Sequence, residues 1–157
     1  MERLVFIGNM AAPHQVRFCQ HLQTYFQTEF WFYEHIGADR PSWWKIDLPP
    51  ECRVLGRPWL RRRQRYLTLR VISQLRRFNP DIIILGGFFI PSNYLAYQWG
   101  KRHGKTVIVF TETFRQDQGL RGESVGTRLV DWLYRDLNAV FACHVAAKAG
   151  HLLGDLR

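Results

Sequence analysis

The sequence has little cysteine and no long apolar run, and both absences narrow what the protein can be. Three cysteines occur among 157 residues, at positions 19, 52 and 143, and no two of them form a C-x-x-C pair. This spacing disfavours a disulfide framework or a zinc site, so we interpret the cysteines as small core residues. No apolar run approaches the roughly 18 residues of a membrane span, and no signal-peptide pattern follows Glu2 and Arg3. We therefore expect a cytoplasmic protein.

Several short motifs of nucleotide-binding and hydrolytic enzymes are also missing. Residues 8–13 read Gly-Asn-Met-Ala-Ala-Pro, which is not a G-x-G-x-x-G fingerprint, and no P-loop sequence G-x-x-x-x-G-K-[ST] is present. A dinucleotide cofactor and a P-loop are therefore disfavoured. Neither H-E-x-x-H nor G-x-S-x-G occurs, so metal-dependent and serine-hydrolase chemistry lack support. We expect no metal site, and no cofactor bound by this chain alone.

The charge is strongly positive and comes mostly from arginine. The net charge is +9, and 18 of the 22 basic residues are arginines. Arginine favours planar, bidentate contact with phosphate or carboxylate, which predicts an anionic partner. Net charge alone does not choose among nucleic acid, an acidic membrane surface and a phosphate-bearing small molecule.

Strand-like and helix-like segments alternate along the whole chain. With a hydrophobic content of 46%, residues 1–157 can form one core, and one domain is expected at this length. The pattern predicts an α/β fold, a Rossmann-like parallel sheet of about six strands with helices on both faces in a single three-layer domain. The predicted strands are 4–7, 29–34, 52–55 at a sheet edge, 82–85 at the centre, 106–110 and 138–143, and the predicted helices begin near 13, 61, 91, 124 and 145.

The first of these units ends its strand in a loop of the kind that binds ligands. Residues 4–7 are apolar, Gly8 permits a sharp turn, and Pro13 suits the first position of a helix. In a strand-loop-helix unit, ligands usually lie at the carboxyl end of the strand. His14 and Gln15 are placed at that position, in the first turn of the predicted helix.

If the strands are parallel, their carboxyl ends share one edge, and several polar or glycine-rich segments meet there. The double glycine 86–87 allows either close approach of a ligand or a tight turn. Glu112 is a candidate for binding sugar hydroxyls or acting as a base, or else pairs with Arg115. His14 is a candidate for contacting phosphate or taking a proton, or else is a helix-start residue. The candidate catalytic residues are Glu112 and His14, and the candidate substrate-binding residues are Gly8, Asn9, Gln15, Gly86, Gly87 and His144.

Eight arginines lie between Arg57 and Arg77. If a helix runs from about 61 to 78, its apolar residues fall on one side and most of its arginines on the other. One interpretation is a solvated helix face, and the other is a surface for phosphates such as anionic lipid headgroups. The residues proposed for such a membrane or anion surface are Arg61, Arg62, Arg63 and Arg65.

The order of these features resembles the N-terminal, acceptor-side domain of GT-B glycosyltransferases of the family-4-like type, over nearly the whole chain. The opening strand with Gly8 leads into the helix start Pro13-His14-Gln15. The matching segments further along are Asn-Pro-Asp-Ile-Ile at 79–83, Gly86-Gly87, Gly-Lys-Thr-Val-Ile-Val at 104–109 followed by Glu112, and Leu-Asn-Ala-Val-Phe-Ala at 137–142 before His144.

The resemblance implies that this half receives a glycan or lipid-linked acceptor, while a second Rossmann-like half holds a nucleotide-sugar donor across a cleft. The chain stops where that half would begin and has no E-x7-E pair of glutamates. We therefore expect it to need a C-terminal donor domain or a partner subunit, and to act at the cytoplasmic face of a membrane as a peripheral protein. Two alternatives stay open. One is a noncatalytic basic α/β module that binds nucleic acid or another polyanion, although no nucleic-acid motif is present, and the other is a small nucleotide-binding enzyme complete at this length.

Overall fold

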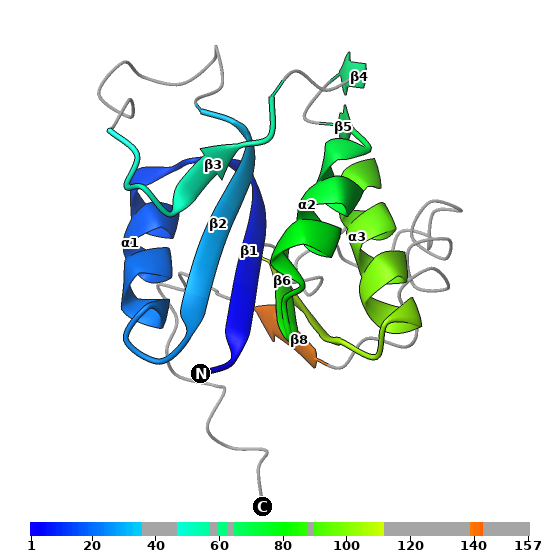
Figure 1. Ribbon diagram of the computed structural model, residues 1–157. Coiled ribbons are helices and arrows are strands. Elements are labelled where there is room, and N and C mark those ends of the chain that lie inside the picture. Colours follow the sequence, from blue (N-terminus) through cyan, green and yellow to red (C-terminus); the bar gives the residue numbers. More distant parts are fainter. Residues whose placement is uncertain (36–46, 57–59, 63–64, 88–89, 112–138, 143–157) are drawn as a thin grey trace, which may run out of the picture.

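A computed structural model describes residues 1–35, 47–56, 60–62, 65–87, 90–111 and 139–142 (Figure 1). A six-stranded sheet runs through this part of the chain, and every pair of neighbouring strands is parallel. In spatial order its strands are β3 (Cys52–Val54), β2 (Gln27–Glu34), β1 (Arg3–Met10), β6 (Ile82–Gly86), β7 (Thr106–Thr111) and β8 (Ala139–Ala142). The chain thus builds the sheet outwards from β1, first to one side and then to the other, which is the doubly wound Rossmann order.

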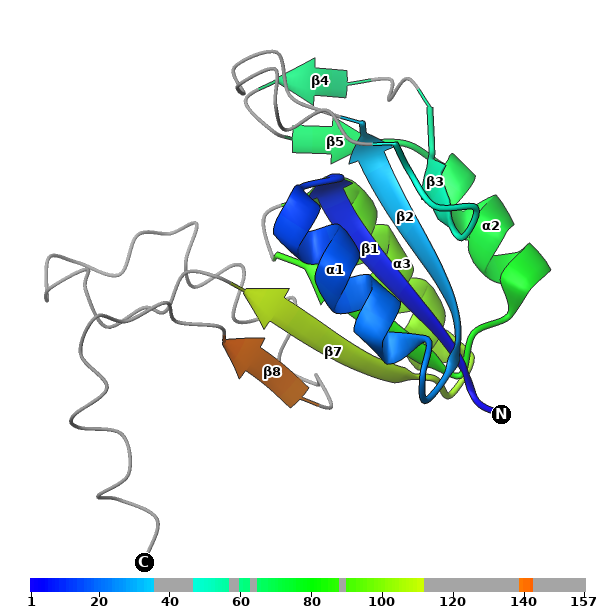
Figure 2. The ribbon, with the colours of Figure 1, turned by 90° about the vertical axis from the view of Figure 1, so that its left-hand side faces the viewer.

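Helices cover both faces of this sheet, as predicted. α1 (Pro13–Leu22) lies on one face, and α2 (Arg70–Phe78) and α3 (Pro91–Arg102) lie on the other (Figures 1 and 2). The alternation of side chains along β1 explains how one strand serves two cores. Leu4 and Phe6 pack with Val16 of α1, whereas Val5 and Ile7 belong to the cluster that contains α2 and α3. β1 is therefore buried on both faces, as its apolar sequence indicates.

The strand predictions are confirmed where the structure describes them, except that the first strand, β1, continues to Met10. Gly8 therefore lies within β1, opposite Phe32 of β2, and not in a turn as predicted. The segment 52–55 supplies the edge strand β3, and 82–85 supplies the central strand β6 between β1 and β7. Cys19 is fully buried and Cys52 is half-buried, both without a disulfide. Burial raises the pKa of both thiols, that of Cys52 to about 11, so they are the inert core residues we expected. Cys143 and the helices predicted near 124 and 145 lie outside the described residues.

The predicted helix from 61 to 78 is wrong in its first half. Two short strands, β4 (Leu60–Arg62) and β5 (Arg65–Leu67), pair antiparallel as a hairpin, and the helix α2 begins only at Arg70. The ring of Tyr66 explains the difference, because it is buried beside the sheet and stacks on the ring of Tyr33 at a centroid distance of 5.3 Å. This tertiary contact favours an extended backbone over the local helical period.

Candidate functional site

The reversal of strand order between β1 and β6 marks the candidate site. β1 pairs with β2 on one side and with β6 on the other, so that Ile7 lies opposite both Trp31 and Leu85. After β1 the chain leaves for α1 on one face, and after β6 it leaves for α3 on the opposite face (Figure 2). In doubly wound folds, ligands bind at the carboxyl ends of the strands where two connections diverge in this way. We therefore take this switch point as the candidate site and call it the switch-point crevice, defined by the described residues 8–15, 86–87 and 90–93.

Two glycines, Gly8 and Gly86, allow the two strands to lie close together below the crevice. A Cβ atom at Gly86 would lie 3.2 Å from the Cα of Gly8 and 3.2 Å from the carbonyl oxygen of Ile7. A Cβ atom at Gly8 would lie 2.9 Å from the ring of Phe6. Packing against protein atoms therefore accounts for glycine at both positions. Gly87 differs, because its φ of 100° favours glycine, while among the described residues no atom beyond its chain neighbours lies within 4 Å of its Cβ position.

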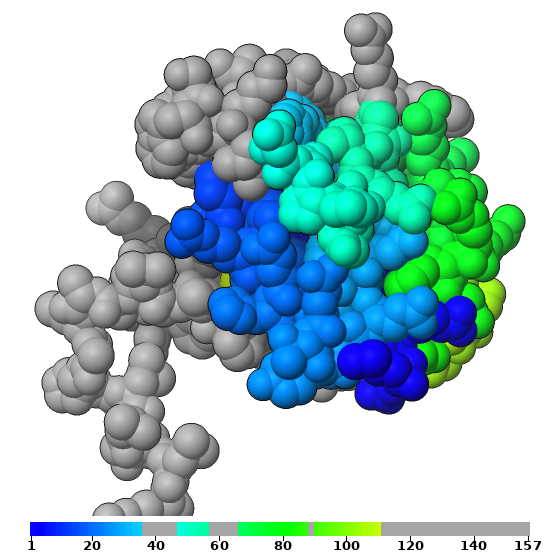
Figure 3. Space-filling view, turned by 60° about the vertical axis from the view of Figure 1, so that its left-hand side comes forward, coloured from blue at the N-terminus to red at the C-terminus, as the bar shows by residue number. Residues whose placement is uncertain are grey.

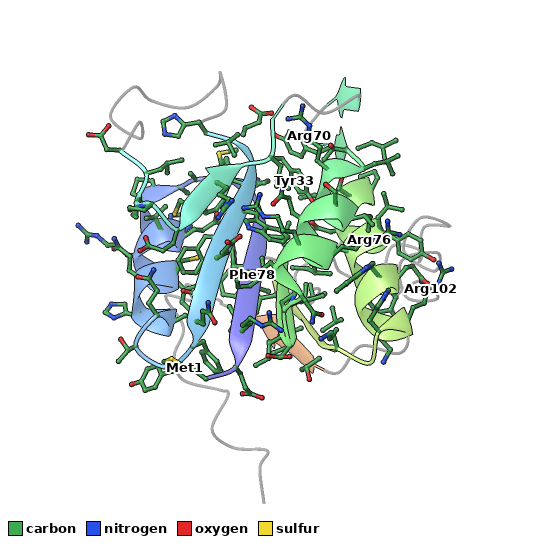
Figure 4. All side chains as sticks on the ribbon, in the orientation of Figure 1. Met1, Tyr33, Arg70, Arg76, Phe78 and Arg102 are labelled. Atoms are coloured by element: carbon green, nitrogen blue, oxygen red, sulfur yellow. The ribbon has the colours of Figure 1, made fainter. Side chains whose placement is uncertain are left out.

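A buried polar network holds the turn after β6. The hydroxyl of Tyr33 donates a hydrogen bond of 2.8 Å to Oδ1 of Asn93, and Nδ2 of Asn93 donates one of 2.9 Å to the carbonyl of Gly87. The Gly87 N–H donates to the carbonyl of Phe110 at 2.9 Å. Figure 4 shows Tyr33 at the carboxyl end of β2, between the sheet and the helices of the second face. Strands β2 and β7 and helix α3 thus fix this wall of the crevice together.

The start of α3 also holds the hairpin of β4 and β5. Oγ of Ser92, which is fully buried, accepts a hydrogen bond of 2.8 Å from the N–H of Thr68 and donates one of 2.9 Å to the carbonyl of Tyr66. The hairpin therefore lies at the carboxyl edge of the sheet, beside the crevice (Figure 2). Arg61, Arg62 and Arg65 belong to it, with Arg61 opposite Tyr66 and Arg62 opposite Arg65 in the register. These arginines lie on a hairpin next to the candidate site, and not on a helix face.

On the other side of the crevice, local hydrogen bonds hold the end of β1 and the two residues before α1. Oδ1 of Asn9 accepts a hydrogen bond of 2.8 Å from the N–H of Met10, and the N–H of Ala11 donates to the carbonyl of Glu34. α1 then begins at Pro13 with no side-chain cap and no acidic residue in its first turn. α3 begins in the same way at Pro91. Two uncapped helix starts, each the positive end of a helix dipole, therefore border the crevice.

Gln15 carries an unused acceptor at this helix start. Its Oε1 atom is buried and accepts no hydrogen bond within the part of the chain that the structure describes. A buried amide oxygen without a donor is unfavourable by about 1–3 kcal/mol, so a ligand hydroxyl that donates to it would be stabilised. His14, its neighbour in the first turn, is exposed.

The structure brings six of the predicted residues to the same crevice: Gly8, Asn9, His14, Gln15, Gly86 and Gly87. Glu112, His144 and Arg63 lie outside the described residues, although Glu112 directly follows β7 in the sequence. Sequence reasoning missed Tyr33 and Asn93, which read as ordinary strand and helix residues. One signal in the sequence could have identified Asn93. It is a polar residue in the first turn of the helix that follows the apolar strand and its double glycine.

Among the described residues no group of three or more histidine, cysteine, aspartate or glutamate side chains could hold a metal ion. None of the helices described is long and apolar enough to cross a membrane. Comparisons with protein-family models, curated proteins and solved structures found no match to this chain.

Proposed function

We propose that this chain is the acceptor-binding half of a glycosyltransferase that moves a sugar from a nucleotide-sugar donor to a lipid-linked or polysaccharide acceptor. The observation that carries the proposal is the reversal of strand order between β1 and β6, at a switch point without a dinucleotide fingerprint. A crevice that lacks the glycine-rich phosphate loop suits an acceptor better than a complete dinucleotide cofactor. The nucleotide sugar is then bound by a second half, in a further domain or a partner subunit.

The groups around the crevice support a ligand with hydroxyl and phosphate groups. The buried Oε1 of Gln15 can accept a hydrogen bond from a sugar hydroxyl. The uncapped starts of α1 and α3 favour a negatively charged group. In this proposal His14 and Glu112 are the candidates for proton transfer, and His144 completes the acceptor side.

The position of the basic hairpin supports a phosphate-linked acceptor or one presented at a membrane. Arg61, Arg62 and Arg65 belong to a hairpin that the side chains of Tyr66 and Ser92 hold at the edge of the crevice. Arginines beside the entrance can contact the phosphate of a lipid-linked acceptor or the headgroups around it. A cytoplasmic protein that binds the membrane peripherally is consistent with this arrangement.

The catalytic part of the proposal is tested by supplying a nucleotide-sugar-binding Rossmann domain in trans and following transfer of labelled sugar to a lipid-linked acceptor. We expect transfer only when both parts are present, and a loss of at least about 100-fold in Glu112→Gln, as for removal of a general base. If no transfer or donor hydrolysis appears with any candidate second half, the catalytic proposal is wrong.

One observation favours the alternative of a noncatalytic module for nucleic acid. The arginines occupy a two-stranded antiparallel hairpin, and such a ribbon fits the major groove of DNA. Binding that weakens steeply with salt, and that is lost when Arg61, Arg62 and Arg65 are replaced by glutamine, would support it.

A further inference from the structure

A second polar site lies away from the switch point, between the edge strand β3 and the first half of α2. It is a pocket of about 270 Å³ lined by Arg53, Val54, Leu55, Arg70, Ser73 and Gln74. β3 is separated from β1 by β2, so this pocket is distinct from the switch-point crevice. Residues of β3 and α2 lie near each other on the surface shown in Figure 3. We call it the edge pocket.

Arg53 is held in the edge pocket by a chain of hydrogen bonds from the neighbouring strand. Its Nη2 atom donates to Oε1 of Glu29 at 2.8 Å, and Nε1 of Trp31 donates to Oε2 of the same carboxylate at 2.8 Å. The side chain of Arg53 is 39% exposed and that of Glu29 only 18%. The Nε–H of Arg53 is buried and has no hydrogen-bond partner in the described part of the chain. The guanidinium is therefore positioned by protein groups and keeps unused donors.

The second arginine of the edge pocket, Arg70, extends from the start of α2 towards the residues after β3. Its Nη1 atom donates to the carbonyl of Leu55 at 3.3 Å. A Cβ atom at Gly56, whose φ is 85°, would overlap that Nη1 atom. The positive φ favours glycine at this position, and the guanidinium of Arg70 packs against it. Figure 4 shows Arg70 at the start of α2, near the end of β3.

The chemistry of the pocket fits a phosphate group. Each guanidinium has five N–H donors, and only a few are used by Glu29 and Leu55. None of the six lining residues is acidic. Among the described residues, the carboxylate of Glu29 is the one that pairs with Arg53, and it neutralises only one of the two positive charges of Arg53 and Arg70. Two positioned guanidiniums match the oxygens of a phosphate bidentately.

We propose that the edge pocket binds a phosphate group through Arg53 and Arg70. The phosphate belongs either to a soluble phosphomonoester or to an anionic lipid headgroup. The apolar side chains next to the two arginines, Val54 at 41% and Leu69 at 53% exposed, would lie against the acyl region of a lipid. This proposal does not rest on the glycosyltransferase proposal, because it uses neither the crevice nor the basic hairpin.

The test is a titration of the ¹⁵N-labelled protein with inorganic phosphate, followed by the backbone signals of residues 53–56 and 70–74 and the indole N–H of Trp31. Arg53→Gln and Arg70→Gln should each weaken binding about tenfold or more, because a hydrogen bond to a charged group contributes roughly 1.5–3 kcal/mol. Arg77→Gln removes an exposed arginine from the same helix and serves as the matched control, since Arg77 does not line the pocket.

A parallel arm uses vesicles of phosphatidylcholine with and without phosphatidic acid. Vesicle binding lost in Arg53→Gln and Arg70→Gln, with little response to free phosphate, assigns the site to a lipid headgroup. The reverse result assigns it to a soluble phosphate ester. If neither probe binds, or if Arg77→Gln weakens binding as much as the two pocket variants do, the edge pocket is not a phosphate site. Thermal melts of all variants check that they are folded.

Discussion

The hydroxyl of Tyr33 donates a hydrogen bond of 2.8 Å to the side chain of Asn93, across 60 residues of sequence. Through Asn93 the bond reaches the carbonyl of Gly87, so a tyrosine at the end of β2 helps to hold the turn that follows β6. Both partners are buried. If the Tyr33 hydroxyl were removed, the amide oxygen of Asn93 would stay buried without this hydrogen bond, which lowers the stability of the folded state. Substitution of Tyr33 therefore tests how the turn at the crevice is held.

Replacing Tyr33 by phenylalanine should therefore lower the free energy of unfolding by about 1–3 kcal/mol, because Oδ1 of Asn93 would stay buried without the donor it has now. Chemical denaturation followed by circular dichroism measures the change. Tyr25, whose side chain is exposed, provides the control, and Tyr25→Phe should change stability by less than about 0.5 kcal/mol. Equal effects of the two substitutions would show that the Tyr33–Asn93 bond does not stabilise the turn.

Gly86→Ala should destabilise the protein by about 1–3 kcal/mol, since the new methyl group would meet the backbone of Gly8 and Ile7, which cannot move as a flexible side chain can. Gln20→Ala on the exposed part of α1 is the control, with an expected change within about 0.5 kcal/mol. Unchanged stability of Gly86→Ala would mean that the two strands are not packed closely below the crevice.

Removal of the hairpin arginines should weaken binding to anionic membranes. In Arg61→Gln/Arg62→Gln/Arg65→Gln we expect binding to vesicles with anionic lipid to fall on the order of 100-fold, because each arginine near the surface contributes about 1 kcal/mol. A variant with Arg76, Arg77 and Arg102 replaced by glutamine removes the same charge from α2 and α3. Vesicle flotation compares the two, and equal losses would show that net charge, not the hairpin, governs binding.

The carboxyl group of Asp81, at the opposite edge of the sheet, should make the stability of the protein depend on pH. The backbone N–H of Arg3 donates to its Oδ2 at 3.0 Å, and together with Lys105 this hydrogen bond lowers the pKa of the carboxyl group below its ordinary value. A lowered pKa in the folded state means that the stabilisation is present above the unfolded pKa of about 3.9 and is lost as the pH falls through the folded pKa.

Asp81→Asn should consequently be less stable than the parent protein at pH 7, and the difference should shrink as the pH is lowered below about 4. Denaturation curves between pH 7 and the acid limit of folding, recorded on both proteins, measure this convergence. A difference in stability that is independent of pH would show that the Asp81 carboxylate does not supply it.

The central fold was accessible from the sequence because its signals are local. The apolar run 4–7 with Gly8 and Pro13, and the run 82–85 with its double glycine, each specify a buried strand and the start of a helix within a few residues. The parallel order and the shared carboxyl edge then follow from general rules of connection.

The hairpin and the polar network could not be found in this way. Tyr66 is extended because of its contacts with the ring of Tyr33 and with Ser92, which is 26 residues further along the chain. The spacing of apolar residues and arginines over residues 61–78 is that of a helix, although only Arg70–Phe78 forms one. Asn93 likewise acquires its role only once the ends of β2 and β6 are brought together.

The most direct measurement of the central claim is a binding titration at the switch-point crevice. The ¹⁵N-labelled chain is titrated with a short-chain prenyl diphosphate-linked sugar, and the backbone signals of Asn9, Gln15 and Gly87 are followed. We predict saturable shifts at these residues. The affinity should fall about fivefold or more in Gln15→Ala but not in Gln20→Ala on the same helix, because a hydrogen bond contributes roughly 1 kcal/mol. Shifts confined to other parts of the chain, or equal affinity of the two variants, would contradict the assignment of the crevice as the acceptor site.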